Sequence, residues 1–294
     1  MDYMDYINYK LKDNFVEIKE SSFIYNKNNM GFSSQEKSDS FLSMISYIEE
    51  GLEKDLFMIY FQPQYNLITG EQIGVEALAR LKNIKGQILS PGYFIPIAEC
   101  TNQIYKLEKW IVKTALEHKK DWENKGIDKY SISINLSAKS LIHDKHFDEL
   151  LNIISFSSVN LNTVIIEVTE TAIIPNAEKA FKNLKSLKNL GIKIALDDFG
   201  TGFSSLSHLE DLPVDIIKFD RSIIKKLPYN VKTCSIVKAF VMLSKDLGYD
   251  VVAEGIESKE QLEFLKNLKC INGQGFLFAK PVPPSELLPN CNFK

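Results

Sequence analysis

Short apolar runs alternate with longer amphipathic stretches along most of the chain. Strand-like apolar runs occupy residues 57–63, 73–79, 131–137, 164–170, 192–198, 215–220, 250–257 and 273–279. In residues 178–191 the apolar positions recur at helical spacing, and Gly191 follows the last of them. Residues 235–248 show the same spacing and end on Gly248. Strands that alternate with helices in this way predict a parallel sheet covered by helices.

The number and spacing of the strand-like runs narrow the fold class. Eight runs over about 250 residues match the size of a (β/α)8 barrel. Only the turn at residues 68–71 separates the first two runs, and so short a connection allows only an antiparallel hairpin. The sequence therefore predicts an α/β fold, an irregular TIM-type (β/α)8 barrel with an antiparallel first strand.

The first 39 residues lack this order. Residues 1–39 are rich in Asn, Ser, Lys and Tyr and show no sustained period, so we expect a weakly structured tail or linker. Ser40 is the predicted N-cap of a first helix, whose apolar face would consist of Phe41, Ile45, Ile48 and Leu52. Residues 40–294 are predicted to form the functional domain.

Composition excludes several other classes of protein. Of the 294 residues, 45% are hydrophobic and 25% are charged, as in a soluble globular protein, and the net charge of -3 argues against binding to long nucleic acids. The cysteines show no CxxC spacing and indicate thiols in a reducing compartment: Cys100, Cys234, Cys270 and Cys291. No apolar run approaches the roughly 20 residues of a membrane helix, and the first residues do not resemble a secretory signal. A cytoplasmic location is expected.

Two adjacent aspartates, Asp197 and Asp198, end the apolar run at residues 192–198. Neighbouring residues of a strand point to opposite faces, so a half-buried strand would place only one polar side chain in the barrel. Two adjacent like charges also repel each other unless a positive group lies between them. A bound cation is the simplest explanation of this pair.

Polar residues end the other strand-like runs as well. They are Glu76, Asn135, Glu167, Glu170, Lys218, Asp220, Glu254, Glu257 and Gln274. Side chains at the carboxyl ends of barrel strands converge on one mouth, where such barrels carry out their chemistry. Carboxylates and a carboxamide, without Cys or His, favour Mg²⁺ or Mn²⁺. So many acidic groups exceed what one ion needs, which predicts two ions bridged by a carboxylate and the hydrolysis of a phosphate ester.

Less specific interpretations apply to some of these residues. A single acid at a strand end is usually a helix N-cap or a solvated loop residue, and Asp220, Glu257 and Glu170 fit such roles. Polar residues at the ends of six predicted strands are harder to explain as caps or solvated loop residues. His143 and His146 form an HxxH pattern, which we interpret as a polar surface loop or helix start rather than a zinc site.

Ordered short motifs along the chain resemble those of a known family. They are FQP (61–63), EALAR (76–80), SPGYFIPIAE (90–99), INLS, EVTE, DDFGTGFSSL, KFDRS, AEGIE and QGFLFAKP. Together they resemble the EAL domain family of bacterial cyclic di-GMP phosphodiesterases, from about residue 41 to about residue 284. The resemblance implies an irregular barrel with an antiparallel first strand, in agreement with the predicted hairpin.

The resemblance also implies a role for each matching position. One metal ion would be held by Glu76, Asn135, Glu167 and Asp197. Asp197 would bridge to a second ion, held also by Asp198 and Glu254. Lys218 would orient the attacking water or stabilise charge on the phosphate, so the expected catalytic residues are Lys218, Glu254 and Glu76.

Further positions match substrate contacts and a regulatory loop of the family. Contacts to the dinucleotide, or support for them, are expected from Gln62, Arg80, Glu257 and Gln274. Glu170 would anchor the glycine-rich loop that follows Asp198, which in the family couples dimerisation to metal binding. A homodimer is therefore expected.

The implied function is hydrolysis of cyclic di-GMP to linear pGpG with Mg²⁺ or Mn²⁺, which lowers the level of this second messenger. Ca²⁺ is expected to bind but inhibit, because its loose geometry and weaker acidity activate water poorly. The alternative is a catalytically silent receptor that binds the dinucleotide and signals through a partner; loss of metal ligands would mark it, and here all are present. A protein-binding scaffold would leave the full ligand set unexplained.

Overall fold

The computed structural model describes residues 34–83, 86–173, 176–200 and 212–287. These residues belong to two compact units. The first contains the described residues of Met1–Met58 and Ala79–Leu107, and the second contains those of Ile59–Leu78 and Glu108–Lys294.

The strands form a closed barrel. Its members are β1 (Phe57–Asn66), β2 (Gln72–Lys82), β4 (Ser131–Asn135), β5 (Val164–Thr169), β6 (Lys193–Phe199), β7 (Ile216–Phe219), β8 (Asp250–Ala253) and β9 (Asn272–Gly273). They follow the order β1-β9-β8-β7-β6-β5-β4-β2, and β1 also pairs with β2, which closes the ring of eight strands. β1 runs antiparallel to β9, whereas the pairs from β2 through β4 to β9 are parallel. The predicted irregular barrel is confirmed.

The hairpin between β1 and β2 explains the reversed first strand. The side-chain oxygen of Asn66 accepts hydrogen bonds from the backbone N–H groups of Ile68 and Thr69, both at 2.9 Å. Gly70 has φ 78°, a left-handed conformation that glycine adopts without strain. The chain therefore reverses within the predicted turn, too short for a crossover helix.

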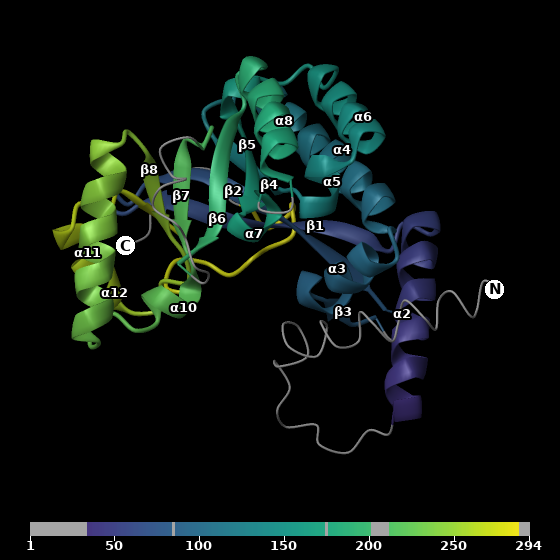
Figure 1. Cartoon of the computed structure of the whole chain (residues 1–294), viewed down its shortest axis with the longest axis horizontal. Helices are drawn as coiled ribbons and strands as arrows, with labels where there is room; N and C mark the ends of the chain where they lie inside the picture. Colours follow the sequence, from purple (N-terminus) through teal and green to yellow (C-terminus); the bar gives the residue numbers. More distant parts are fainter. Residues whose placement is uncertain (1–33, 84–85, 174–175, 201–211, 288–294) are drawn as a thin grey trace. The chain divides into compact units, whose positions relative to one another are not determined.

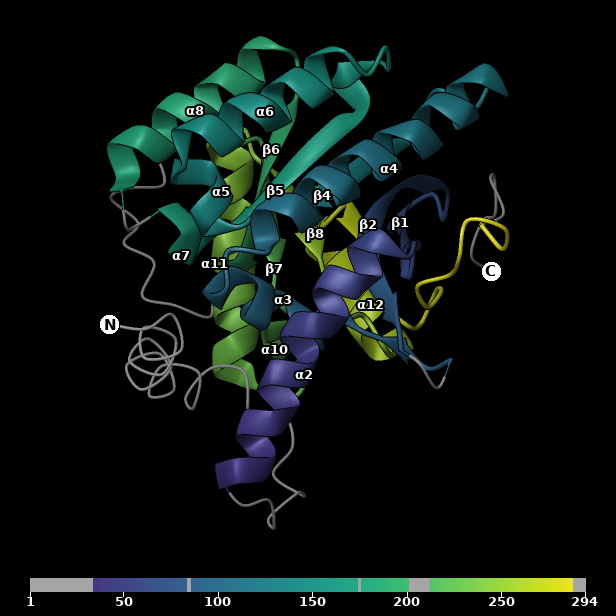
Figure 2. The same ribbon diagram turned by 90° about the vertical axis from the view of Figure 1, so that its right-hand side faces the viewer.

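Helices cover the outer surface of the barrel. In the second unit they are α4 (Ile104–Asn124, whose first residues belong to the first unit), α5 (Ala138–Ile142), α6 (Asp144–Ser155), α7 (Glu170–Ile173), α8 (Ala177–Asn189), α10 (Arg221–Ile224), α11 (Val231–Asp246) and α12 (Lys259–Asn267). α5 contacts α6 and α8, which lie side by side (Figures 1 and 2). The helices predicted at residues 178–191 and 235–248 correspond to α8 and α11.

Side-chain capping defines several helix ends. Asn176 accepts a hydrogen bond from the N–H of Lys179 at 3.1 Å and caps α8, while Ser258 and Gln261 form a capping box at α12. Gly191 and Gly248, predicted to follow helices, have φ values of 90° and 80°. Both glycines therefore end their helices in the left-handed conformation.

An apolar layer fills the barrel interior below the mouth. It is formed by Ile165, Ala195, Ile216 and Val252, one from each of the neighbouring strands β5 to β8. Because strand side chains alternate between faces, the residues two positions further along these strands also point inward. This alternation determines which side chains reach the mouth.

The first unit consists of α2 (Ser34–Glu53), β3 (Ile88–Leu89), α3 (Pro91–Cys100) and the adjoining parts of β1 and β2. α2 packs on α3, and the rings of Phe57 and Phe94 meet edge to face at 5.4 Å. The predicted helix exists, but it begins at Ser34, so Ser40 lies inside it rather than at its N-cap.

Two elements differ from the sequence expectation. The strand predicted at residues 273–279 is limited to Asn272–Gly273, and a turn follows it. Glu170, expected on an extended strand end, is the first residue of α7. In both places the chain leaves the sheet as soon as it reaches the mouth, which a local hydrophobic pattern does not reveal.

Candidate active site

A polar layer lies two residues beyond the apolar layer on the same four strands. It consists of Glu167, Asp197, Lys218 and Glu254, the last directly after β8. β2 and β4 add Glu76 and Asn135, and the register pairs Asn135 with Glu167. Gln274 follows β9. Because every second side chain of a strand points inward, the apolar interior is followed directly by a polar mouth two residues further along the strands.

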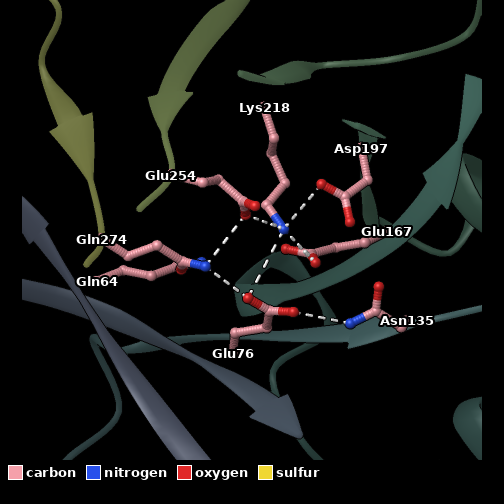
Figure 3. A network of polar contacts seen from close by, with 8 residues as sticks. All are labelled: Gln64, Glu76, Asn135, Glu167, Asp197, Lys218, Glu254 and Gln274. Carbon is pink, nitrogen blue, oxygen red and sulfur yellow. Dashed lines mark hydrogen bonds and ion pairs between the residues drawn. The ribbon is translucent and has the colours of Figure 1, made fainter. Parts of the chain in front are cut away.

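The Lys218 ammonium lies among four carboxylates (Figure 3). Its Nζ is 2.5 Å from Glu167 Oε2 and 2.6 Å from Glu254 Oε1. Asp197 Oδ1 is 3.3 Å away and Glu76 Oε2 is 3.7 Å away. Lys218 is only 1% exposed, so water screens these interactions little.

Burial and mutual repulsion shift the pKa values of this cluster. Burial lowers the pKa of Lys218, but the surrounding carboxylates outweigh it and hold the pKa well above its ordinary value. Burial, with repulsion from neighbouring carboxylates, raises the pKa of Glu167 well above its ordinary value. The same causes raise the pKa of Glu254 to about 8. One ammonium therefore does not balance the negative charge gathered here.

Glu76 is held by amide donors on both oxygens. Asn135 Nδ2 donates to Oε1 at 2.8 Å, and Gln274 Nε2 donates to Oε2 at 2.6 Å. Gln274 also donates to Glu254 Oε1 at 3.1 Å and accepts from Gln64 Nε2 at 3.0 Å. Although burial opposes it, Lys218 and these hydrogen bonds lower the pKa of Glu76. Glu76 is therefore fixed in place as an anion.

The paired aspartates lie at an irregularity of β6. The β6–β7 register shifts between Leu196 and Phe199, and Asp198 has φ 55° in the left-handed region. Such a bulge re-aims side chains that a regular strand would send to opposite faces. Partial desolvation, with repulsion from Asp197 and Asp220, raises the pKa of Asp198 to about 6. Both carboxylates therefore contribute to the charge at the mouth.

The chemistry of these groups fits divalent metal ions. Asp197 Oδ1 is buried and has no hydrogen-bond donor within the described residues, although Lys218 is near enough for an ion pair. Hard oxygen donors with surplus negative charge suit Mg²⁺ or Mn²⁺. Over the described ranges, however, no three acidic, His or Cys groups form a ready coordination sphere. The carboxylates are instead turned toward Lys218 (Figure 3).

The structure also locates the expected substrate contacts and the loop anchor. Gln62 donates to the carbonyl of Ala279 at 2.6 Å. Arg80 belongs to the first unit and donates to the carbonyl of Ala79 at 2.9 Å. Glu257 pairs with Arg221, with Oε1 2.5 Å from Nη2. Of the loop expected to contact Glu170, residues 201–211 lie outside the described residues.

Sequence reasoning missed two buried polar residues near the mouth. Gln64 lies two positions after Gln62 in β1, so strand alternation alone would have placed both on the same face. Glu108 lies in α4 and accepts from the N–H of Ser137 at 2.6 Å and from the Ser140 hydroxyl. No local motif marks Glu108.

Of the two histidines, His143 takes the exposed helix-start role that the sequence suggested, whereas His146 does not. His143 caps α6 by accepting from the N–H of His146 at 3.3 Å. His146 is buried, and its Nε2 lies 3.4 Å from Glu108 Oε2. Asp220, by contrast, caps α10 through the N–H of Ser222 at 2.8 Å, one of the roles considered for it.

In (β/α)8 barrels the active site lies at the carboxyl ends of the strands, where this carboxylate-rich mouth lies. Sequence comparison identifies the family. The EAL domain matches residues 46–281. The chain therefore belongs to the EAL domain family.

Named relatives support this assignment. MucR of Pseudomonas aeruginosa, a bifunctional diguanylate cyclase/cyclic di-GMP phosphodiesterase, is 33% identical over 91% of this chain and 38% of its own length. The cyclic di-GMP phosphodiesterase PA2567 of the same organism is 35% identical over 81% of this chain and 40% of its own length. This chain thus spans about two fifths of the length of these relatives.

A solved structure of the MucR phosphodiesterase in complex with c-di-GMP has the same fold. It superposes with a TM-score of 0.80 at 34% identity, over 84% of this chain and all of that chain (100%). Within the described residues, no helix is both long and apolar enough to cross a membrane.

Proposed function

We propose that this chain hydrolyses cyclic di-GMP to linear pGpG with the aid of two divalent metal ions. The observation that carries the proposal is the polar layer at the barrel mouth, where carboxylates from several strands surround Lys218. The named relatives, described as cyclic di-GMP phosphodiesterases, support the choice of substrate.

The residues that would hold the ions lie at neighbouring strand ends. Glu76, Asn135, Glu167 and Asp197 are proposed for one ion. Asp197, with Asp198 and Glu254, is proposed for the other. Bound Mg²⁺ or Mn²⁺ would neutralise these carboxylates, polarise the phosphate and acidify the attacking water. Asn135 and Gln274 keep Glu76 oriented for this role.

Lys218 is proposed to stabilise negative charge on the phosphate or to orient the attacking water. In the metal-free site the surrounding carboxylates hold the pKa of Lys218 well above its ordinary value, and a charged ammonium at this place is suited to electrostatic stabilisation. Bound metal ions would compete with Lys218 for these carboxylates, which would leave the ammonium free to face an anionic substrate. Contacts to the dinucleotide, direct or indirect, are proposed for Gln62, Arg80, Glu257 and Gln274.

The direct test is incubation with cyclic di-GMP and Mg²⁺ or Mn²⁺, with the products separated by chromatography. We expect linear pGpG, complete loss of activity with EDTA and recovery when metal is added back. Ca²⁺ should support binding but not turnover. Full activity in metal-stripped protein with chelator present would exclude the metal mechanism. Binding without any turnover would favour the alternative function, a catalytically silent receptor.

A further inference from the structure

A buried carboxylate and a buried imidazole lie together behind the turn that follows β4. Glu108 of α4 and His146 of α6 are each 3% exposed, and His146 Nε2 is 3.4 Å from Glu108 Oε2. The Ser140 hydroxyl donates to the same carboxylate oxygen. Burying a carboxylate is costly unless hydrogen bonds and a positive partner compensate for the lost water. Ser140 supplies such a hydrogen bond, and His146 supplies the positive charge when its ring is protonated.

The other oxygen of Glu108 holds the backbone beside a proposed metal ligand. Glu108 Oε1 accepts from the N–H of Ser137 at 2.6 Å, and Ser137 lies two residues after Asn135. Between them, the N–H of Leu136 donates to the carbonyl of Glu167 at 2.9 Å. The turn that carries Asn135 is therefore fixed on one side by the metal site and on the other by a carboxylate from α4.

Three helices meet at this carboxylate. Ser137 is the N-cap of α5, and its hydroxyl oxygen accepts from the N–H of Ser140 at 3.2 Å. Glu108 reaches the same two serines from α4, and His146 reaches Glu108 from α6. The orientation of the Glu108 carboxylate thus depends on His146, and the position of the turn depends on Glu108.

We propose that His146 is a positioning residue for the metal site, acting through Glu108 on the turn that carries Asn135. The inference rests on the proposed function and adds a residue that touches neither metal ion nor substrate. Groups that orient metal ligands change metal affinity, because small displacements of the ligands are costly. His146 should therefore affect the affinity for metal ions, and not the rate or the substrate KM once the ions are bound.

The matched control is His118, a half-buried histidine on the same helix as Glu108. Its ring meets the ring of Phe61 edge to face at 5.4 Å. His118 lies ten residues after Glu108, about 15 Å further along the helix axis. His118→Leu therefore removes an imidazole and its packing without touching the turn after β4.

The test measures Mn²⁺ binding directly, from the electron paramagnetic resonance signal of the free ion, and in parallel the hydrolysis of cyclic di-GMP at increasing Mn²⁺. His146→Leu should weaken Mn²⁺ binding about fivefold. At saturating Mn²⁺ its kcat and KM should stay within about twofold of wild type. His146→Gln, whose amide nitrogen can replace Nε2, should restore the affinity, and His118→Leu should leave it unchanged.

A double variant tests the route through Glu108. If His146 acts only through Glu108, then Glu108→Ala and the double variant Glu108→Ala/His146→Leu should bind Mn²⁺ equally well. Losses that add up in the double variant would show that His146 acts on the site by another route, and would overturn the proposal.

The remaining outcomes separate this inference from the proposed function. Unchanged Mn²⁺ affinity in His146→Leu, or an equal loss in His118→Leu, would overturn the positioning role. If His146→Leu loses the circular dichroism spectrum of wild type, His146→Asn, with a shorter side chain, takes its place in the test. Mn²⁺ binding without hydrolysis in the wild type would reject the proposed catalysis and leave the positioning role standing. No Mn²⁺ binding by the wild type would reject both.

Discussion

At the scale of single residues, Lys218 is the one ammonium among the four carboxylates of the described polar layer. Removing it leaves buried negative charges without their partner, at a cost of about 3 kcal/mol or more in unfolding free energy. We expect Lys218→Met to lower the thermal midpoint of metal-free protein and to show a larger upward shift with Mg²⁺ than wild type.

Differential scanning fluorimetry with and without Mg²⁺ measures both quantities for Lys218→Met. Lys188→Ala is the control, because this lysine forms a half-buried pair with Asp215 at 2.6 Å, away from the carboxylate cluster. If Mg²⁺ raised the thermal midpoint of Lys218→Met and of wild type by the same amount, the ammonium and the metal ions would not compete for the carboxylates.

Glu76 and Asp197 contribute charge at the mouth rather than packing in the apolar layer. We expect Glu76→Ala and Asp197→Ala to lose more than about 3 kcal/mol of transition-state stabilisation, at least about a hundredfold in kcat/KM. Both should keep the circular dichroism spectrum of wild type. Glu149→Ala, which removes a partly exposed carboxylate on α6, should keep full activity. Near-normal turnover in a variant would remove that residue from the metal site.

Cys270 illustrates how burial controls reactivity. It is 1% exposed, and burial raises the pKa of its thiol to about 12. Because only the thiolate reacts, the reactive fraction at pH 8 is about one in ten thousand. We expect iodoacetamide at pH 8 to modify the half-buried Cys100 and Cys234 and to spare Cys270 until denaturant is added. Peptide mapping would contradict this if Cys270 reacted as fast as Cys234 in native protein.

At the scale of elements, α4 supports the turn after β4. Glu108, 3% exposed in α4, accepts from the N–H of Ser137, two residues after Asn135. Losing this buried acceptor costs about 1–3 kcal/mol and loosens the segment that aims Asn135. We expect Glu108→Ala to be less stable and to need more metal for half-maximal activity, with partial recovery in Glu108→Gln.

Urea unfolding and metal titrations of activity separate the two effects of Glu108. The matched control is Glu149→Ala. Glu149 pairs at 2.8 Å on the surface with Lys109, which directly follows Glu108 in α4. A stability loss in Glu108→Ala with an unchanged metal requirement would limit Glu108 to a structural role.

The elements also show how far the sequence predicts the site. Period-two alternation and the positions of the strand ends predicted that seven polar residues lie close together, and their contacts show that they do. They are Glu76, Asn135, Glu167, Asp197, Lys218, Glu254 and Gln274. The bulge at Asp198 and the start of α7 at Glu170 depend on pairing with distant strands and loops. The Glu108–Ser137 contact joins residues 29 positions apart, so no local sequence pattern predicts it.

At the scale of the whole molecule, the expected homodimer stays a prediction. We expect light scattering to give about twice the chain mass of 33.5 kDa. Glu170 begins α7 directly after β5, which carries Glu167, and is expected to hold the loop that follows the two aspartates. Because small displacements of metal-binding groups are costly, Glu170→Ala should raise the metal requirement and weaken the dimer while the fold persists.

The control for Glu170→Ala is Glu178→Ala, an exposed acid in the first turn of α8. It removes the same charge from a helix N-terminus, so the general effect of the helix dipole is matched. Metal titrations of activity and light scattering on both variants decide the question. If Glu170→Ala matches Glu178→Ala in metal requirement and mass, Glu170 is a solvated acid that connects neither dimerisation nor metal binding to the loop.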